Sequence, residues 1–206
     1  MKKCTLSFLF LIALTFSLKA QLTQNYESAS TLGKKGMNLS SYYSSLQLVC
    51  DHSPEYQDNE YLRNFGLRLG YGITNRFDLQ LSYSYLSLVD LNHHFCISPK
   101  YSIYKNKIAA SIPLSFYFGN EGKLFTLSPK IILTQAISQY FDISLISKME
   151  VAVGGSFERF YSVSIGFGVS KNLQKWAIRP ELGLHHKLSS SSAVWSYGLG
   201  FQYKFK

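Results

Sequence analysis

The sequence predicts an all-β protein, an antiparallel up-and-down transmembrane β-barrel of about ten strands, within a range of about eight to twelve. Three observations predict it: an export signal, a near-continuous alternation of apolar and polar residues, and a polar face built from small residues. The composition agrees, because only 16% of the 206 residues are charged, against a usual share of about 25%. So few charges are poorly suited to an exterior that faces water.

The start of the chain has the pattern of a secretory signal peptide. Lys2 and Lys3 precede an apolar stretch over residues 6–16, and cleavage is expected after Ala20, with Ser17 as the alternative. A membrane anchor is the other interpretation, but the stretch is shorter than the ~20 residues that a spanning helix needs. The expected parts are the signal peptide (1–20), a periplasmic N-terminal segment (21–36) and an outer-membrane β-barrel domain (37–206).

The rest of the chain alternates with the period of a β-strand. Large apolar residues occupy every second position of Phe77–Tyr85, Tyr161–Val169 and Trp195–Phe205. Successive side chains of a strand point to opposite faces, so each of these stretches has one apolar and one polar face. No run after the signal peptide has helical spacing. The ten strands expected on this basis cover residues 38–50, 60–73, 76–89, 94–104, 107–118, 123–135, 140–151, 160–170, 175–186 and 194–205.

The connections alternate between short turns and longer loops, as they do in outer-membrane barrels with periplasmic turns. The short turns lie at 74–75, 105–106, around 138–139 and at 172–174, and the longer loops at 51–59, 90–93, 119–122, 152–159 and 187–193. Charge follows the same division. The short turns carry bases and no acid, whereas the loop end carries Asp51, Glu55, Asp58, Glu60, Asp90, Glu121 and Glu158. Those acids are expected to be solvated, with calcium or magnesium binding as the alternative.

The composition of the two faces decides between a soluble and a membrane barrel. A soluble barrel encloses its apolar face, whereas a membrane barrel turns that face to lipid. The polar face here is mostly Ser and Gly, which suits a crowded interior. Aromatic residues lie near both strand ends, for example Tyr71 and Phe205 at one end and Phe95 and Trp195 at the other. Such rings prefer the lipid headgroup region, so the pattern favours the membrane barrel.

On these features the chain resembles small outer-membrane β-barrel proteins of Gram-negative bacteria over roughly residues 37–205. The signal peptide, the hairpin Leu67–Tyr85 turning at Thr74–Arg76, and a last strand with aromatic residues at 201, 203 and 205 carry the resemblance. It implies a location in the cell outer membrane, contact with outer-membrane lipid and lipopolysaccharide, and recognition of the last strand by the barrel-insertion machinery. Lys206 follows the terminal aromatic residue and departs from that pattern. The resemblance carries no catalytic residue over.

The polar faces would bring ten charged residues into the barrel lumen. By strand parity they are Arg68, Asp78, Lys100, Lys130, Asp142, Lys148, Glu150, Arg179, Glu181 and Lys204. Ions in a low-dielectric interior must pair or stay hydrated, so we expect a structural network that fills the barrel. The alternative is a charged constriction in a narrow, porin-like pore, slightly favouring anions because six bases face four acids.

Histidines near the loop end raise the possibility of a rim enzyme acting on lipid or peptide. They are His52, His93, His94, His185 and His186. A histidine beside a carboxylate could act as a general base or bind a metal. However, the chain has neither a G-x-S-x-G nor an H-E-x-x-H motif, and adjacent histidines on a strand point to opposite faces. We expect no catalysis, no cofactor and no metal.

Four prolines resist the strand interpretation. Pro99, Pro113, Pro129 and Pro180 fall inside expected strands, where proline removes a hydrogen-bond donor. Bulges or shorter strands would accommodate them. The sequence thus predicts a monomeric integral outer-membrane barrel with a structural or surface-interaction role. The narrow pore and the rim enzyme are the alternatives, and no basic aromatic patch suggests a nucleic acid partner.

Overall fold

The computed structural model describes residues 25–47, 61–87, 91–119, 122–153, 159–187 and 193–205. The predicted signal peptide, the predicted cleavage site and most of the longer loops lie outside these ranges. The strands are β1 (Met37–Gln47), β2 (Tyr61–Gly72), β3 (Phe77–Leu86), β4 (His93–Tyr104), β5 (Ile108–Ser111), β6 (Leu114–Phe118), β7 (Lys123–Leu127), β8 (Lys130–Ala136), β9 (Phe141–Ala152), β10 (Phe160–Val169), β11 (Trp176–Lys187) and β12 (Ala193–Phe205). Among the described residues, no helix is long and apolar enough to cross a membrane.

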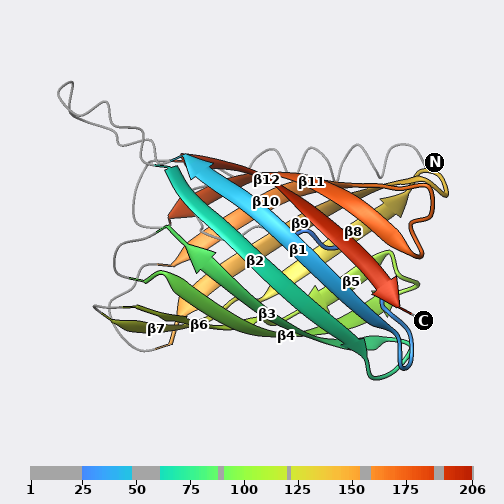
Figure 1. Ribbon diagram of the computed structural model, residues 1–206, viewed down its shortest axis with the longest axis horizontal. Helices are drawn as coiled ribbons and strands as arrows, with labels where there is room; N and C mark the ends of the chain where they lie inside the picture. The colour runs from blue at the N-terminus through green and yellow to red at the C-terminus, as the bar shows by residue number, and fades with distance from the viewer. Residues whose placement is uncertain are drawn as a thin grey trace, which may run out of the picture.

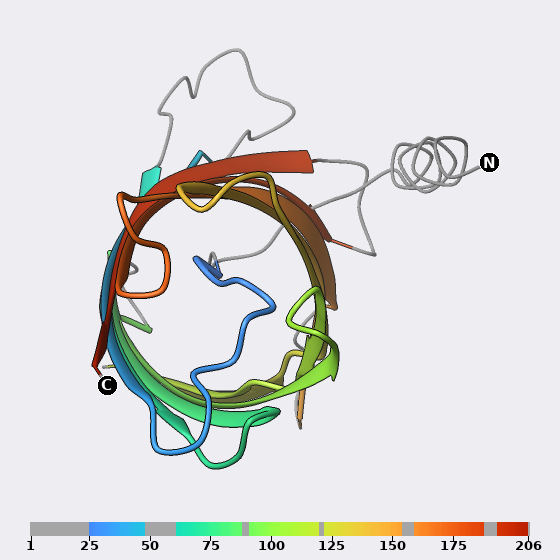
Figure 2. The same cartoon turned by 90° about the vertical axis from the view of Figure 1, so that its right-hand side faces the viewer.

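The strands form one closed antiparallel barrel (Figures 1 and 2). β12 pairs with β1, and β9 pairs with β10, so no edge is left open. β5 and β6 pair with successive parts of β4 and act as one barrel strand, and β8 and β7 pair with successive parts of β9 in the same way. The twelve segments therefore make ten barrel strands, which confirms the predicted all-β up-and-down barrel.

Two of the four in-strand prolines explain the broken strands. Pro113 separates β5 from β6, and Pro129 separates β7 from β8, where the sequence predicted unbroken strands over 107–118 and 123–135. The carbonyl of each proline still accepts a bond from the neighbouring strand, Pro113 from the Ser128 amide at 2.9 Å and Pro129 from the Met149 amide at 3.0 Å. The prolines thus remove a donor and keep the barrel closed.

The two faces of the wall are oriented as the membrane interpretation predicts. Along β2, Leu67 and Leu69 are 50% and 55% exposed on the outer surface, whereas Arg68 between them is 9% exposed. The same holds around the barrel, with Leu199 52% exposed and Trp195 61% exposed. An apolar exterior around a polar interior is the arrangement of a barrel in lipid, and it contradicts the soluble alternative.

The short turns, the start of β1 and the end of β12 all lie at one end of the barrel (Figure 1). Met37 at the start of β1 pairs with Phe205 at the end of β12. In the tightest turn, the Lys107 amide donates to the Tyr104 carbonyl at 2.7 Å, and the two residues between them have positive φ angles of 37° and 59°. We call this side the short-turn end and the opposite side the loop end.

Candidate functional site: the charged interior

The interior of the barrel contains the charged residues that strand parity assigns to it. Nine of the ten are less than one tenth exposed, and Lys204, near the short-turn end, is partly exposed. The nine are Arg68, Asp78, Lys100, Lys130, Asp142, Lys148, Glu150, Arg179 and Glu181. They come from β2, β3, β4, β8, β9 and β11, so they surround the interior from most sides. Charges buried to this degree require partners.

A segment that sequence reasoning placed outside the barrel runs through this interior. Residues 25–32, here called the internal segment, cross the ring of strands in Figure 2. Its first five residues, 25–29, are all buried, and none belongs to a strand. The sequence predicts that 21–36 is a separate polar stretch without strand periodicity, and the structure describes residues 25–36 of it. It does not indicate that part of this stretch lies inside the barrel.

Glu27 is the charged centre of the internal segment. Its Oε1 lies 2.9 Å from Arg68 Nη1 and 2.8 Å from Lys130 Nζ, which join it to opposite parts of the wall. Burial alone would raise the pKa of Glu27, but the charges of Lys130, Arg68 and Lys100 outweigh it and lower the pKa to about 2. The carboxylate is therefore ionised over the physiological pH range.

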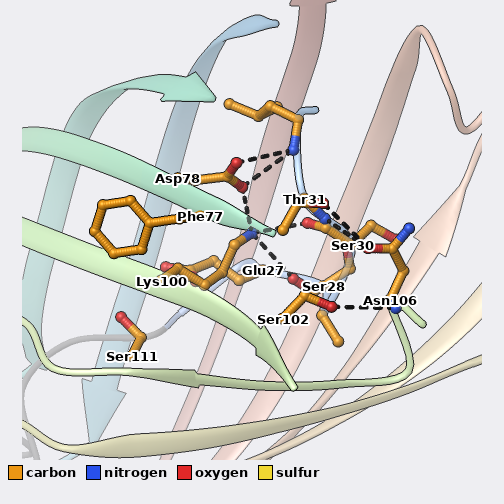
Figure 3. A network of polar contacts seen from close by, with 12 residues as sticks. Glu27, Ser28, Ser30, Thr31, Phe77, Asp78, Lys100, Ser102, Asn106 and Ser111 are labelled. Atoms are coloured by element: carbon orange, nitrogen blue, oxygen red, sulfur yellow. Dashed lines mark hydrogen bonds and ion pairs between the residues drawn. The ribbon is translucent and has the colours of Figure 1, made fainter. Parts of the chain in front are cut away.

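A second ion pair holds the other end of the segment (Figure 3). Asp78 accepts two bonds of 3.1 Å from the Leu32 amide, and its Oδ2 lies 3.5 Å from Lys100 Nζ. Lys100 in turn donates to the Ser30 carbonyl at 2.8 Å. The pair from β3 and β4 thus satisfies both an amide and a carbonyl of a backbone stretch that has no sheet partner.

Glu181 of β11 binds the beginning of the segment. Its two carboxylate oxygens accept the backbone amides of Asn25 at 2.9 Å and Tyr26 at 2.6 Å. The Tyr26 hydroxyl donates to the Tyr43 carbonyl of the wall at 2.8 Å. Consecutive amides that converge on one carboxylate fix the path of the chain, because charge-assisted bonds are the stronger hydrogen bonds.

Small residues on the inner face make room for the segment. A Cβ at Gly200 would lie 2.8 Å from the Cβ of Tyr26, and a Cβ at Gly70 would overlap Asn38 Oδ1 and lie 3.1 Å from Leu32 Cδ1. Both approaches to the nearest atom are closer than side chains tolerate. Glycine at these positions of β12 and β2 is therefore required by the close approach of neighbouring groups.

Three further charged groups, Arg179, Asp142 and Glu150, bond to one another or to other wall residues. Arg179 and Asp142 form two parallel bonds of 2.9 Å between β11 and β9. Glu150 accepts from the Tyr117 hydroxyl at 3.1 Å and from Thr126 Oγ1 at 3.0 Å. Bidentate and multiply bonded carboxylates of this kind compensate for the cost of burial.

An apolar cluster narrows the interior at the loop end. Leu46, Leu86, Tyr117 and Val194 are each at most 5% exposed, and Leu91 and Leu124 pack against them. They come from the loop ends of β1, β3, β6 and β12 and from neighbouring residues. Beneath this cluster, the space beside Glu27, Arg68 and Lys130 is a cavity of only about 30 Å³. That cavity has room for only a few water molecules.

The open space lies at the short-turn end instead. There the interior widens into a cavity of about 840 Å³, which we call the vestibule. Its floor includes Ser28, Ser30 and Leu32 of the internal segment, and its walls come from β8, β9, β11, β12 and the adjoining turns. Of these two cavities, the one beside Glu27 is small and the one at the short-turn end is large.

The histidines at the loop end divide between the two faces of the wall. His94 and His185 are buried inside, 4% and 1% exposed. His94 Nδ1 lies 3.1 Å from Ser84 Oγ, and His185 bonds the Ser196 hydroxyl. His93 lies on the outer face with its Nδ1 2.7 Å from the Tyr83 hydroxyl.

The remaining histidine, His52, lies outside the described ranges, and His186 adjoins His185 on β11. Within the described ranges, no three His, Cys, Asp or Glu side chains are grouped closely enough to hold a metal ion.

Glu27 is the functional residue that sequence reasoning missed. Its neighbours in sequence have no periodicity from which burial could be inferred. One signal was present, however, because strand parity predicted six bases and four acids in the lumen. Glu27 supplies a fifth acid in contact with two of those bases, so the predicted imbalance indicated a missing anion.

Comparison with known proteins finds neither a matching family model nor a matching curated protein. Several solved structures resemble the chain weakly. The N-terminal β-barrel domain of OprF from Pseudomonas aeruginosa has 14% identity and a TM-score of 0.38, covering 84% of this chain and 99% of the other. Ail, the attachment invasion locus protein of Yersinia pestis, has 13% identity and a TM-score of 0.36, with 84% and 99% covered. OprG from Pseudomonas aeruginosa has 11% identity and a TM-score of 0.30, with 85% and 99% covered.

The architecture of the chain itself is that of an outer-membrane barrel. In the described residues the antiparallel barrel is closed, with an apolar exterior and a polar interior, so its strands pair with one another and expose no sheet edge to lipid. The protein is therefore an outer-membrane β-barrel.

Proposed function

We propose that the protein is a sealed outer-membrane barrel with a structural or surface-interaction role, without catalysis and without free passage of solutes. The observation that carries this proposal is the internal segment bound across the lumen through Glu27. Arg68 and Lys130 hold its carboxylate from opposite parts of the wall, and Glu181 and Asp78 hold its backbone. In this proposal the ten-residue charge network serves to anchor the segment.

The arrangement of the interior supports a seal over a permanent pore. A permeating ion would have to pass the apolar cluster at the loop end and displace a segment held by ion pairs. Dry apolar constrictions oppose ion passage, and breaking buried ion pairs is costly. The longer loops, which carry seven of the twelve acids, would then present the interacting surface outside the cell. Outer-membrane lipid and lipopolysaccharide are the partners of the barrel in this proposal.

The narrow pore is the second candidate, and the vestibule is the observation that favours it. A cavity of about 840 Å³ already reaches into the lumen from the short-turn end. Departure of residues 25–32 would extend it towards the loop end. The pore would therefore be a second state of the same barrel, reached only when the internal segment leaves.

Planar-bilayer recordings of the purified protein test the proposal. We expect the full chain to give no discrete conductance, and a variant that lacks residues 25–32 to give channel events. A heat-modifiable band on gels would show that both proteins are folded. Steady conductance of the full chain would contradict the seal and favour the pore.

A further inference from the structure

The vestibule at the short-turn end carries a strong and uncompensated positive charge. Five basic residues line it, and one acidic residue, so its formal charge is 5 − 1 = +4. The five are Lys105, Lys107, Lys171, Arg179 and Lys204. The acid is Asp142, whose two oxygens are already bound by Arg179 at 2.9 Å. Among the described residues, no other carboxylate lines the cavity.

The turn lysines of this set are not neutralised by the protein. Lys105, Lys107 and Lys171 are exposed, and in the part of the chain that the structure describes none of them forms an ion pair. They come from two turns, one between β4 and β5 and one between β10 and β11. Two turns far apart in the sequence thus direct their charge to one cavity.

The cavity also offers neutral hydrogen-bond donors beside the lysines. Asn106 uses its Oδ1 to accept from the amide of Thr31 at 3.3 Å and from the Thr31 hydroxyl at 3.1 Å. This arrangement leaves the Asn106 amide group to donate to another acceptor. Ser138, Gln139 and Asn172 line the same cavity and add hydroxyl and amide groups.

Volume, charge and donors together indicate the chemistry of a ligand. A cavity of about 840 Å³ falls in the range of about 300–1,000 Å³ that small-molecule sites occupy. Concave surfaces of one sign of charge concentrate ions of the opposite sign. Lysine ammonium groups bind phosphate as point charges, and amide groups complete its hydrogen bonds.

We propose that the vestibule binds a small, multiply charged phosphate-bearing ligand. An anionic lipid headgroup of the adjacent leaflet and a free phosphate compound share this chemistry. Lys107 and Lys171 bind the ligand from the rim, and the wall between β8 and β12 encloses it. The site is separate from the ion pairs that hold Glu27, so it can be filled while the internal segment stays in place.

Titration calorimetry with inorganic tripolyphosphate tests the site on the full chain in a neutral detergent. We expect saturable binding that weakens at high salt, because screening reduces the attraction between exposed charges. In the double variant Lys107→Gln/Lys171→Gln, the affinity should fall by about tenfold or more. The matched control is Arg76→Gln/Lys175→Gln, which removes two charges from the same end of the barrel at residues that do not line the vestibule. Its affinity should stay within about twofold of the unchanged protein.

Two results would overturn the proposal. One is the absence of saturable tripolyphosphate binding by the unchanged protein. The other is an equal loss of affinity in both double variants, which would show diffuse surface charge and no site. A heat-modifiable gel shift for each variant shows that a loss of binding does not come from misfolding.

Lipid nanodiscs distinguish the two sources of phosphate. If a headgroup fills the vestibule, tripolyphosphate binding should be weaker in discs of phosphatidylglycerol than in discs of phosphatidylcholine, and the vestibule variant should abolish this difference. If the ligand is a free phosphate compound, binding should be the same in both kinds of disc. Either result supports the site and identifies which phosphate source occupies it.

Discussion

The Glu27 carboxylate and the Lys130 ammonium group lie 2.8 Å apart inside the barrel, although 103 residues separate them in the sequence. Glu27 belongs to a segment without regular secondary structure, and Lys130 begins β8. Because Arg68 of β2 contacts the same carboxylate oxygen, one acidic side chain joins the internal segment to two distant parts of the wall.

Removing the charge of Glu27 should destabilise the barrel. In Glu27→Gln, Arg68 and Lys130 would remain buried without their anion, and such broken pairs cost about 3–5 kcal/mol. The measurement is the free energy of unfolding in urea, with the protein in detergent micelles. As the control, Lys34→Gln changes an exposed charge of the same polar stretch and should alter stability by less than about 0.5 kcal/mol. Equal stability of Glu27→Gln and the unchanged protein would contradict the account.

A double-mutant cycle separates the ion pair from other effects. Lys130→Met removes the second charge and keeps an apolar side chain of similar length. We expect the double variant Glu27→Gln/Lys130→Met to be less destabilised than the sum of the two single variants, because residues in contact do not act additively. An additive result would show that the two side chains do not interact in the folded barrel.

The contribution of Glu27 to the free energy of unfolding should decrease as the pH falls. The pKa of Glu27 is lowered from 4.5 to about 2 in the folded protein. A lowered pKa gives stability that is fully present above the unfolded value, here 4.5, and that is lost as the pH falls through 2. The stability difference between the unchanged protein and Glu27→Gln should thus be constant from neutral pH to about pH 5 and should shrink at lower pH. A stability difference between the two proteins that grows as the pH falls would contradict a lowered pKa for Glu27.

A side chain added at Gly200 should clash with the internal segment and destabilise the barrel. A Cβ there would lie 2.8 Å from the Cβ of Tyr26, so Gly200→Ala should cost about 1–3 kcal/mol in the free energy of unfolding. The cost should be smaller when Tyr26→Gly is also present, because glycine removes the Cβ of Tyr26. Gly166→Ala is the matched control, because its Cβ would lie 3.6 Å from Glu181 Oε2, an ordinary contact distance. Equal effects of the two alanines would exclude a specific contact with Tyr26.

A lysine introduced on the outer face should destabilise the barrel more near the middle of the membrane than near its edge. Leu199 is 52% exposed near the middle of β12, and Ile73 is 43% exposed in a short turn. Leu199→Lys should destabilise the barrel in bilayers by about 2–4 kcal/mol, and Ile73→Lys by about 0–1 kcal/mol. The readout is reversible unfolding in lipid vesicles. Similar costs at both positions would be inconsistent with a lipid-facing wall.

Local periodicity was sufficient to predict the wall of the barrel. The alternation at Leu67, Arg68 and Leu69 predicts which side chain points inward, because strand side chains alternate regardless of which strands pair. Strand breaks were harder to predict. Pro113 and Pro129 interrupt the strands, whereas Pro99 and Pro180 stay within β4 and β11. Whether a proline breaks a strand depends on its hydrogen-bonding register with the neighbour, which local sequence does not contain.

The contents of the lumen could be predicted only in part. Strand parity predicts that the Lys130 side chain points inward. Its partner Glu27 belongs to a stretch without alternation of apolar and polar residues, so its orientation could not be predicted in this way. Burial of such a stretch depends on tertiary contacts, above all the amides bound by Glu181 and Asp78. The predicted excess of two bases was the only trace of Glu27 in the pattern. Charge balance within an expected interior is therefore a useful test for missing residues.

Disulfide trapping tests most directly whether the internal segment lies inside the barrel. The Ala29 amide donates to Thr134 Oγ1 at 2.8 Å on the inner face of β8, whereas Ile131 of the same strand is 44% exposed on the outer face. In a background with Cys4→Ser, Cys50→Ser and Cys96→Ser, oxidation should link Ala29→Cys to Thr134→Cys, because disulfides form only between closely spaced residues. Peptide mass analysis should find this link, and none between Ala29→Cys and Ile131→Cys. A link to position 131, or no link to position 134, would contradict a segment enclosed by the barrel.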